Sequence, residues 1–349
     1  MSKLQTAGWK PALPQSEIGN PAIQCTVIVL NWNGREHLPA CLTALRRQTF
    51  RDFKTLLVDN GSADGSVDWA RSEFPEVDLL PLRQNLGFAA GNNRAIRSCN
   101  TPWTALLNND TEADPGWLRA LMNAAASHPP ADFFASQVRL FDRRDLLDSA
   151  GDGMPVAGAS FKIGHLQPAE LHSHSKYVFG ASAAAAMYRT SMLLELDGFD
   201  EDFFCIYEDA DLSFRAQLAG HRCLYVPQAI VYHKSNATLQ RSPGKIVFYG
   251  QRNSEWLVWK SMPSRLLRKY RPLRIIYFVA SFAYFALRGY AATFLRAKGA
   301  AWKERKRLLE RRERLPRQQK VTDEYVDSLL ERHWLRTRVA GKFRMSNFE

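Results

Sequence analysis

Three short apolar runs in the first third of the chain each end in a cluster of polar residues, and this repeated pattern constrains the fold most. The runs are 26–30, 55–58 and 103–107. The clusters that follow them are Asn31-Trp32-Asn33-Gly34, Asp59-Asn60-Gly61-Ser62 and Asn108-Asn109-Asp110. Because successive residues within each run are apolar, each run predicts a strand buried on both faces of a parallel sheet.

Segments with helical spacing alternate with these runs. The predicted helices cover 36–48, 68–73 and 91–98, and a further short strand covers 77–80. Strands and helices that alternate over short connections are typical of an α/β, doubly wound sheet. Ligands of such sheets bind beyond the carboxyl ends of the strands. We therefore expect the three polar clusters to lie on one edge of the sheet.

The second half of the chain is less regular. It predicts a Gly/His-rich loop over 151–174, a strand of small residues over 180–188 and a helix over 212–220. After residue 252 the sequence becomes helical and strongly basic around an apolar stretch, 275–287. We divide the chain into a flexible leader (1–22), an α/β domain (23–255) and a helical, basic region (256–349).

The net charge of +12 is concentrated in the C-terminal region. Residues 260–320 contain 18 Lys/Arg and 3 Asp/Glu, which is +15, so the rest of the chain carries +12 minus +15, or −3. Such a patch attracts phosphate, either of nucleic acid or of anionic lipid. The first twenty residues hold no apolar run, and the five cysteines are scattered without metal-ligand spacing. These features predict a cytoplasmic protein with reduced, mostly buried thiols.

Asp110 is the first candidate for chemistry, because it follows a predicted buried strand. Its carboxylate can hold Mg²⁺ or Mn²⁺ against a diphosphate whose oxygens complete the coordination. The alternative is an Asx turn or the cap of the next helix.

Glu208-Asp209-Ala210-Asp211 is the second candidate, at the start of a predicted helix. Crowded carboxylates beside apolar side chains raise at least one pKa and provide a general base. Alternatively, acidic side chains simply favour the dipole at a helix N-terminus.

His233 ends an apolar segment and is a candidate metal or phosphate ligand, although a lone histidine is more often a structural hydrogen-bonding group. His165, His172 and His174 cluster in a loop without a carboxylate at metal-ligand spacing, and we expect them to be solvated.

The ordered set of motifs resembles the family 2 glycosyltransferases, and most closely their bacterial rhamnosyltransferase-like branch, over residues 24–255. The motifs are Val-Ile-Val-Leu-Asn-Trp-Asn-Gly (27–34), Val-Asp-Asn-Gly-Ser (58–62), Asn-Leu-Gly-Phe-Ala-Ala-Gly-Asn-Asn (85–93), Leu-Leu-Asn-Asn-Asp (106–110) and Glu-Asp-Ala-Asp-Leu (208–212). The resemblance implies a GT-A fold, which is a Rossmann-like, mostly parallel sheet flanked by helices, and an inverting transfer of a sugar from a nucleotide diphosphate.

The resemblance also implies roles for individual residues. Asp209 matches the catalytic base, Asp110 matches the one acidic ligand of a DxD-like metal site in which Asn108 replaces the first Asp, and His233 matches a residue that completes it. Glu208, Asp211 and Arg252 would contact the acceptor or a phosphate. Asn60 stands where many members have Asp, and its amide could accept from a pyrimidine N3–H. The residues implied to bind the donor nucleotide are Leu30, Asn31, Trp32, Asn33, Asp59, Asn60, Asn85, Gly87 and Asn109.

The implied partners are a nucleotide-sugar donor such as dTDP-rhamnose and a lipid-linked or polysaccharide acceptor of the cell surface. The apolar stretch 275–287 is shorter than the roughly 20 residues that span a bilayer. Basic flanks on both sides favour a peripheral position on the anionic inner face of the cell membrane. A core helix or an oligomer contact is the alternative.

Two other functions compete with this interpretation. A metal-dependent nucleotidyltransferase also needs a cation and a nucleotide, but the chain has no basic glycine-rich loop near its first strand. A non-catalytic nucleic-acid-binding protein would use the basic C-terminal region, but that function leaves the acidic cluster 208–211 unexplained. We therefore expect no nucleic-acid partner.

Overall fold

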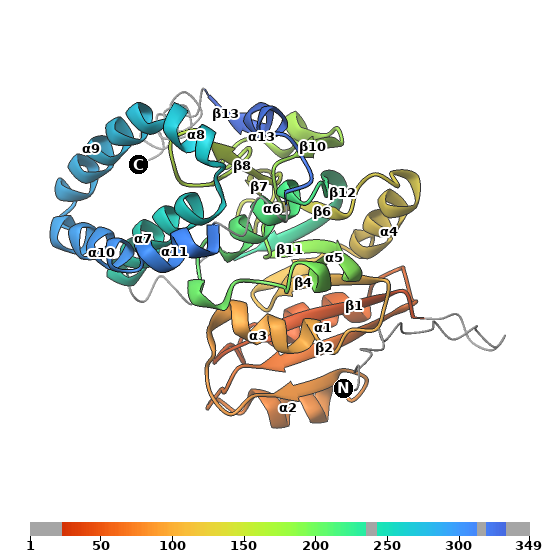
Figure 1. The fold of residues 1–349 in the computed structure, drawn as a ribbon. Helices are drawn as coiled ribbons and strands as arrows, with labels where there is room; N and C mark the ends of the chain where they lie inside the picture. Colours follow the sequence, from red (N-terminus) through yellow and green to blue (C-terminus); the bar gives the residue numbers. More distant parts are fainter. Residues whose placement is uncertain (1–22, 235–242, 313–318, 333–349) are drawn as a thin grey trace, which may run out of the picture.

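The computed structural model describes residues 23–234, 243–312 and 319–332, so the predicted leader lies outside the described residues. A ten-stranded mixed sheet forms the centre, in the order β10-β12-β6-β11-β4-β1-β2-β3, with β5 beside β12 and β7 beside β6 (Figure 1). Its strands are β1 (Cys25–Asn31), β2 (Phe53–Asp59), β3 (Asp78–Pro81), β4 (Trp103–Asn108), β5 (Thr111–Ala113), β6 (Phe133–Leu140), β7 (Leu147–Ser149), β10 (Lys176–Val178), β11 (Ala185–Arg189) and β12 (Cys223–His233).

The register of the central strands brings the three polar clusters together. β1 pairs in parallel with both β2 and β4, so that Asn31 lies opposite Asp59 and Leu30 lies opposite Asn108. The prediction that the clusters share one edge of the sheet is therefore confirmed. β11 lies antiparallel between β4 and β6, and β12 pairs in parallel with β6.

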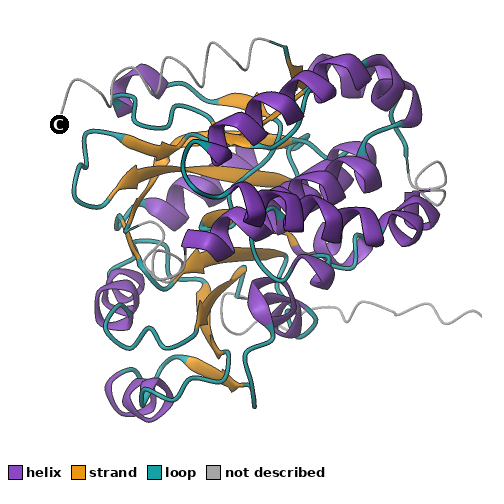
Figure 2. Ribbon diagram, turned by 90° about the vertical axis from the view of Figure 1, so that its left-hand side faces the viewer, coloured by secondary structure: helices purple, strands orange, loops and turns teal. Residues whose placement is uncertain are grey.

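Helices cover both faces of the sheet (Figure 2). Because successive strand residues point to opposite faces, Val27 and Val29 pack in one apolar core while Ile28 packs in the other. The first core includes α1 (Leu38–Arg46), α2 (Ser66–Glu73) and α4 (Trp117–Ser127). The second includes α3 (Gly87–Ile96), α5 (Thr190–Glu195) and α6 (Glu208–Leu218). The α/β class and the sandwiched sheet are as predicted.

Some predicted boundaries differ from the structure. The helix predicted to begin at residue 91 begins at Gly87, whose φ of +85° suits glycine, and the helix predicted from 212 begins at Glu208. The strand predicted over 180–188 is regular only over Ala185–Arg189. The predicted loop 151–174 contains β8 (Asp152–Pro155), β9 (Phe161–Lys162) and the turn η1 (Ala169–His172). With β13 (Leu330–Glu331), β8 and β9 form a second, three-stranded sheet.

The C-terminal helices pack on the α/β domain through a third apolar core. It joins Trp256 and Leu257 to Phe203 and Phe214, the latter on α6. The helices are α7 (Pro243–Ser261), α8 (Ser264–Lys269), α9 (Arg271–Ala286), α10 (Ala291–Lys303), α11 (Arg305–Arg312) and α13 (Asp323–Leu329). α7 runs through position 255/256, and the predicted division of the chain at that position stays a prediction.

The apolar stretch 275–287 lies almost entirely in α9, which stands at the outer side of the helical region (Figure 1). Within the described residues, no helix combines the length and the hydropathy that crossing a bilayer demands. All five cysteines are free, and four of them are buried, as the sequence predicts.

Candidate active site

Polar side chains at the ends of β1, β2 and β4 bond directly to one another. Asn31 Nδ2 donates to Asp59 Oδ1 at 3.1 Å, and Asn109 Nδ2 donates to Asn31 Oδ1 at 2.7 Å. The other oxygen of Asp59 accepts from the backbone N–H of Ser62 at 2.9 Å. Three residues that were predicted to hold the donor nucleotide thus form one network at the sheet edge.

Asn60 uses its amide to fix the loop in front of α3. Its Oδ1 accepts from the backbone N–H of Leu86 at 2.9 Å. Its Nδ2 donates to Asn85 Oδ1 at 3.1 Å and to the Gly87 carbonyl at 3.0 Å. The side chain is buried, and both N–H groups of its amide are used. Its contact with a pyrimidine N3–H, which would need the second lone pair of Oδ1, stays a prediction. Its role is to hold Asn85 and Gly87 in place.

The loop after β1 frames the same edge. Asn33 has a positive φ of 48°, and its Oδ1 accepts from the Ala63 N–H at 2.8 Å, which ties this loop to the one after β2. Leu30 lies against Gly91 of α3, where an added Cβ would come within 2.8 Å of its Cδ1. Trp32 leaves 41% of its surface exposed and offers an aromatic face at this edge.

Asp110 and His233 meet because β5 pairs antiparallel with β12, which places Thr111 opposite His233. Their side chains lie 3.3 Å apart, between Asp110 Oδ1 and His233 Nε2. The other ring nitrogen, Nδ1, lies 2.9 Å from Asp148 Oδ2. All three side chains are buried. The sequence did not point to Asp148, since it lies in the irregular part of the chain.

The two carboxylates decide the charge of His233. Burial lowers its pKa, but the hydrogen bonds to Asp110 and Asp148 outweigh burial and raise the pKa to about 9. Burial opposes ionisation of Asp148, yet its bonds to His165 and His233 and the charge of Lys162 hold its pKa well below the ordinary range. Lys162 Nζ lies 2.7 Å from Asp148 Oδ1.

A histidine ligand must be neutral, so a cation would have to displace the proton between His233 Nε2 and Asp110. With that proton gone, the donor set of Asp110 and His233 fits a divalent cation that a substrate helps to hold. Among the described residues, no group of three His, Cys, Asp or Glu could hold a metal ion by itself. An orienting carboxylate on the second nitrogen of a histidine ligand, as Asp148 provides here, is the usual support of protein metal sites. Diphosphate oxygens and water would supply the remaining ligands, as is common for Mg²⁺.

Asp209 lies at the same edge as Asp110. Its Oδ2 accepts from the Ala183 N–H at 3.3 Å, and the next residue's carbonyl, that of Ala184, accepts from the Asn108 N–H at 2.9 Å. The backbone of residues 183–184 therefore connects Asp209 with the end of β4, two residues before Asp110. Asp110 and Asp209, which are 99 positions apart in the sequence, are thus linked through the backbone at the end of β4.

Three carboxyl groups crowd together around Asp209. Burial, and then the charge of Asp209, raise the pKa of Glu208 to about 8. Burial also raises the pKa of Asp209, against the bonds from the backbone of Ala183 and Ala210 and the charge of Lys162. Asp152 of β8 has a raised pKa from burial and from the charge of Asp209. One Glu208 oxygen is buried without a hydrogen bond. Asp152 and Lys162, like Asp148, lie in the region that the sequence presented as a loop.

Asp211 does not share this environment. Its side chain is fully buried, and it accepts from Lys260 Nζ and from Arg215 Nε, both at 2.7 Å. Two residues make about half a turn of an α-helix, so Asp211 lies on the face opposite Asp209 and contacts α7 through Lys260. The prediction that it contacts the acceptor or a phosphate is wrong, and its role is to hold α6 and α7 together.

Arg252 was predicted to contact the acceptor or a phosphate. Arg252 is half-buried, with its guanidinium 4.1 Å from the centre of the Trp256 ring and its Nε bonded to Asn253 Oδ1 at 2.8 Å. Its contact with a phosphate stays a prediction.

His165 was expected to be solvated, but its Nδ1 lies 3.4 Å from Asp148 Oδ1. The folded loop brings in a carboxylate 17 positions away.

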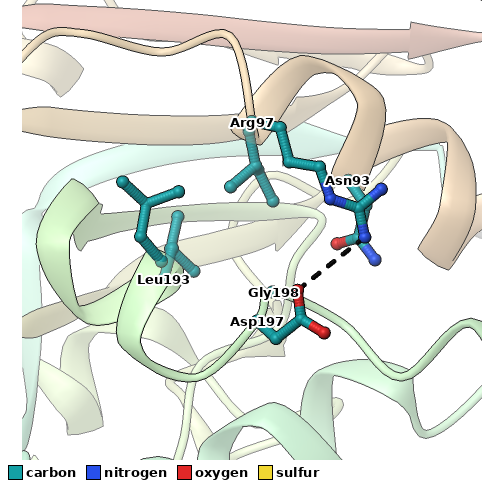
Figure 3. A pocket seen from close by; sticks show the side chains of 7 residues that line it. Asn93, Arg97, Leu193, Asp197 and Gly198 are labelled. Atoms are coloured by element: carbon teal, nitrogen blue, oxygen red, sulfur yellow. Dashed lines mark ion pairs between the residues drawn. The ribbon is translucent and has the colours of Figure 1, made fainter. Parts of the chain in front are cut away.

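A small pocket elsewhere does not compete with this site. It lies at the C-terminal end of α3, where the Arg97–Asp197 ion pair borders it (Figure 3). Its volume of about 20 Å³ is enough for a water molecule and far too small for a nucleotide.

Residues 26–196 match the family model of glycosyl transferase family 2. The chain carries a glycosyltransferase family 2 domain. The glycosyltransferase is 29% identical to N-acetylglucosaminyl-diphospho-decaprenol L-rhamnosyltransferase of Mycobacterium tuberculosis, over 71% of this chain and 92% of that protein. It is also 29% identical to pre-mycofactocin glycosyltransferase of the same organism, over 68% of this chain and 48% of that protein.

Solved structures confirm the GT-A fold of the glycosyltransferase. S. aureus TarS 1-349 in complex with UDP-GlcNAc has a TM-score of 0.55 and 17% identity, covering 80% of each chain. GalNAc-T7 with UDP, GalNAc and Mn²⁺ has a TM-score of 0.52 and 12% identity, covering 77% of this chain and 59% of that one. The nucleotidyltransferase and nucleic-acid-binding alternatives are set aside by the family match.

Proposed function

We propose that this glycosyltransferase moves a sugar, with inversion, from a nucleotide diphosphate to a hydroxyl group of a lipid-linked or polysaccharide acceptor. The observation that carries the proposal is the backbone link between Asp209 and the end of β4, which sets Asp209 and the Asp110–His233 pair on one sheet edge. A base and an anion-holding site on opposite sides of a sugar are what a single displacement requires.

The donor nucleotide would lie over the ends of β1 and β2. Asp59 and Asn31 present a carboxylate and an amide to the ribose and base, and the exposed ring of Trp32 offers a stacking surface. Asp110 and His233 would hold a divalent cation, which neutralises charge on the departing diphosphate. The metal is proposed from the donor set and from Mn²⁺ in the structures of GalNAc-T7 and of PcManGT from Pyrobaculum calidifontis.

Asp209 would act as the general base. Its carboxylate is oriented by the backbone N–H groups of Ala183 and Ala210, so it needs no reorganisation to receive a proton. As the acceptor oxygen forms its bond to the anomeric carbon, its proton passes to Asp209 and the bond to the diphosphate breaks on the opposite face. Glu208 lies beside the base, where it can contact the acceptor.

Rhamnose is the donor sugar that we propose, and dTDP the nucleotide. The support is the L-rhamnosyltransferase of M. tuberculosis, which is similar over 71% of this chain. The test is a transfer assay with Mn²⁺, a lipid-linked sugar acceptor and a panel of nucleotide sugars. We expect turnover with dTDP-rhamnose above turnover with UDP- and GDP-sugars. If none of the nucleotide sugars in the panel were turned over, the proposed function would be contradicted. A preference for another donor would contradict only the proposal of rhamnose.

The pH dependence should report the raised pKa of Asp209. Asp209 must be ionised to accept a proton, so kcat should fall as the pH drops through its raised pKa. Burial and the charge of Asp209 raise the pKa of Glu208 to about 8, so Glu208 is neutral over the acidic limb. Glu208→Gln should therefore leave the acidic limb of the kcat–pH profile in place when substrates are saturating at every pH. A limb that moves by a full unit would contradict this assignment.

We also propose that the C-terminal helices lie on the anionic inner face of the cell membrane. The outer side of α9 and α10 exposes large apolar side chains, namely Leu273, Ile275, Ile276, Phe278, Val279, Leu287, Leu295 and Trp302. The same helical region carries exposed basic side chains that have no carboxylate partner among the described residues: Arg268, Arg271, Arg288, Arg296, Lys303, Arg305 and Lys306. Exposed apolar and cationic side chains in one helical region suit an anionic lipid interface.

Not every basic residue of this region is available to lipid. Lys260, Lys298, Arg274, Arg307 and Arg311 pair with carboxylates of the protein, so part of the positive charge stabilises the packing of the helices. Deleting the region would also uncover the third apolar core. Substitution of exposed side chains is therefore a better test of membrane binding than deletion of the region.

Ile276→Glu combined with Val279→Glu should abolish flotation with vesicles that contain anionic lipid. Both side chains are more than half exposed, so the fold tolerates the change, while burying two carboxylates in lipid is costly. Leu194→Glu, on exposed α5, is the control and should float like the parent. Unchanged flotation of the double variant, or no flotation of the parent, would contradict membrane binding through α9.

A further inference from the structure

The segment before Asp209 has an unusual backbone. Residues 203–207 connect the turn η2 (Glu201–Phe203) to α6, and Phe204, Ile206 and Tyr207 have φ values of 60°, 69° and 72°. Positive φ is rare for residues other than glycine, and it is least tolerated by β-branched side chains such as Ile206. Such a segment keeps its conformation only where surrounding contacts impose it.

Asn253 of α7 supplies those contacts. Its side chain is fully buried, and its Nδ2 lies 2.7 Å from the Ile206 carbonyl, 2.9 Å from that of Cys205 and 3.1 Å from that of Phe203. Its Oδ1 accepts from Arg252 Nε at 2.8 Å, so the guanidinium orients the amide with its N–H groups toward the segment. One side chain thus satisfies consecutive carbonyls of the strained backbone.

The opposite side of the segment rests on α3. The Phe204 carbonyl accepts from the Phe88 N–H at 2.7 Å. The Phe204 ring lies so close to Gly87 that an added Cβ would come within 2.5 Å of it. Segment 203–207 is therefore held between α3 and α7, the helix that carries Asn253. It leads directly into Glu208 and Asp209.

We propose that Asn253 is a positioning residue, which fixes segment 203–207 so that the carboxylate of Asp209 faces the donor. This inference rests on the proposed function, because it concerns the placement of the proposed base. Asn253 itself is buried and acts through the backbone of residues 205 and 206. Arg252 in turn orients Asn253, which gives Arg252 a role that does not require contact with substrate.

Asn253→Asp tests the proposal, because it keeps the shape and removes both N–H donors. We expect kcat to fall about 100-fold, as for other small displacements of reacting groups. KM for the donor should stay within about threefold, since Asn31 and Asp59 lie on other elements. Asn253→Ser retains one hydrogen-bond donor, so its kcat should lie between that of the parent and that of Asn253→Asp. Ser254→Ala is the control, because Ser254 is buried on the same helix but bonds only to Gln251 within it.

Rescue distinguishes positioning from a general loss of stability. Ile206→Gly accommodates positive φ without strain, so Asn253→Ser with Ile206→Gly should recover part of the lost kcat. Rates are normalised to the fraction that binds nucleoside diphosphate, which removes any contribution from unfolded protein. An Asn253→Ser variant with kcat within threefold of the parent would overturn the proposal. A parent enzyme with no transfer activity would instead contradict the proposed function.

Discussion

Asp209→Asn is expected to lower kcat by about 10³-fold, the range in which removal of a general base falls. The amide has nearly the shape of the carboxylate and can still accept from the Ala183 N–H. It cannot take a proton from the acceptor hydroxyl. Binding of a nucleoside diphosphate, measured by calorimetry, should change little, because Asn31, Asp59 and Asn109 are untouched.

A matched control separates this effect from a general loss of acidic charge. Asp145→Asn removes an exposed carboxylate that pairs only with neighbouring Arg143, and it should leave kcat unchanged. Near-normal turnover of Asp209→Asn would mean that another group accepts the proton. Glu208 and Asp152, the two carboxyl groups beside it, would then be the groups to substitute.

Asp110→Asn is expected to raise the Mn²⁺ concentration needed for half-maximal rate by at least about 100-fold and to lower kcat as well. The substitution removes the negative charge that faces the cation and leaves only His233 and amide oxygen atoms of the protein at that position. The measurement is the transfer rate across a Mn²⁺ titration at saturating donor. Asp114→Asn is a suitable comparison, since Asp114 lies four residues further on, after β5, and its carboxylate accepts from the Gly116 N–H.

An unchanged Mn²⁺ requirement in Asp110→Asn would place the cation elsewhere. Activity of the parent enzyme that survives complete chelation would exclude a catalytic role for the cation altogether. In that case the buried Asp110–His233–Asp148 triad would serve only to join β5, β7 and β12.

The local part of the fold could be predicted, because the decisive information lies within short windows. The runs 26–30, 55–58 and 103–107 predicted β1, β2 and β4, and the polar residues after them were correctly placed on one edge. Parallel packing makes this inference independent of any long-range detail. The position of His233 beside Asp110 could not be predicted from short windows, because it depends on the long-range pairing of β5 with β12.

The irregular region was where sequence reasoning failed. Asp148, Asp152 and Lys162 lie on short strands whose pairing is set by segments far along the chain, including β13 at residues 330–331. Such short strands show no hydrophobic periodicity in the sequence that would predict them. Asp211 failed for another reason, because its partner Lys260 lies 49 positions away and turns a carboxylate of the acidic cluster into a buried structural group.

The contacts of Asn60 could not be predicted from the resemblance. Asn60 stands where many family members have Asp, and its amide was expected to accept from a base. In the folded chain both ends of that amide hold the loop 85–87. Gly87 in this loop has a positive φ and lies close to Phe204. Asn60 thus shapes the proposed donor site.

Diffraction from crystals grown with Mn²⁺ and a nucleoside diphosphate is the most direct test of the central claim. The anomalous signal of manganese should lie against the Asp110 carboxylate and His233 Nε2, with diphosphate oxygens on the same ion and Asp209 facing the space where the sugar would be. Manganese and diphosphate bound away from that edge, or Asp209 turned from the bound diphosphate, would contradict it.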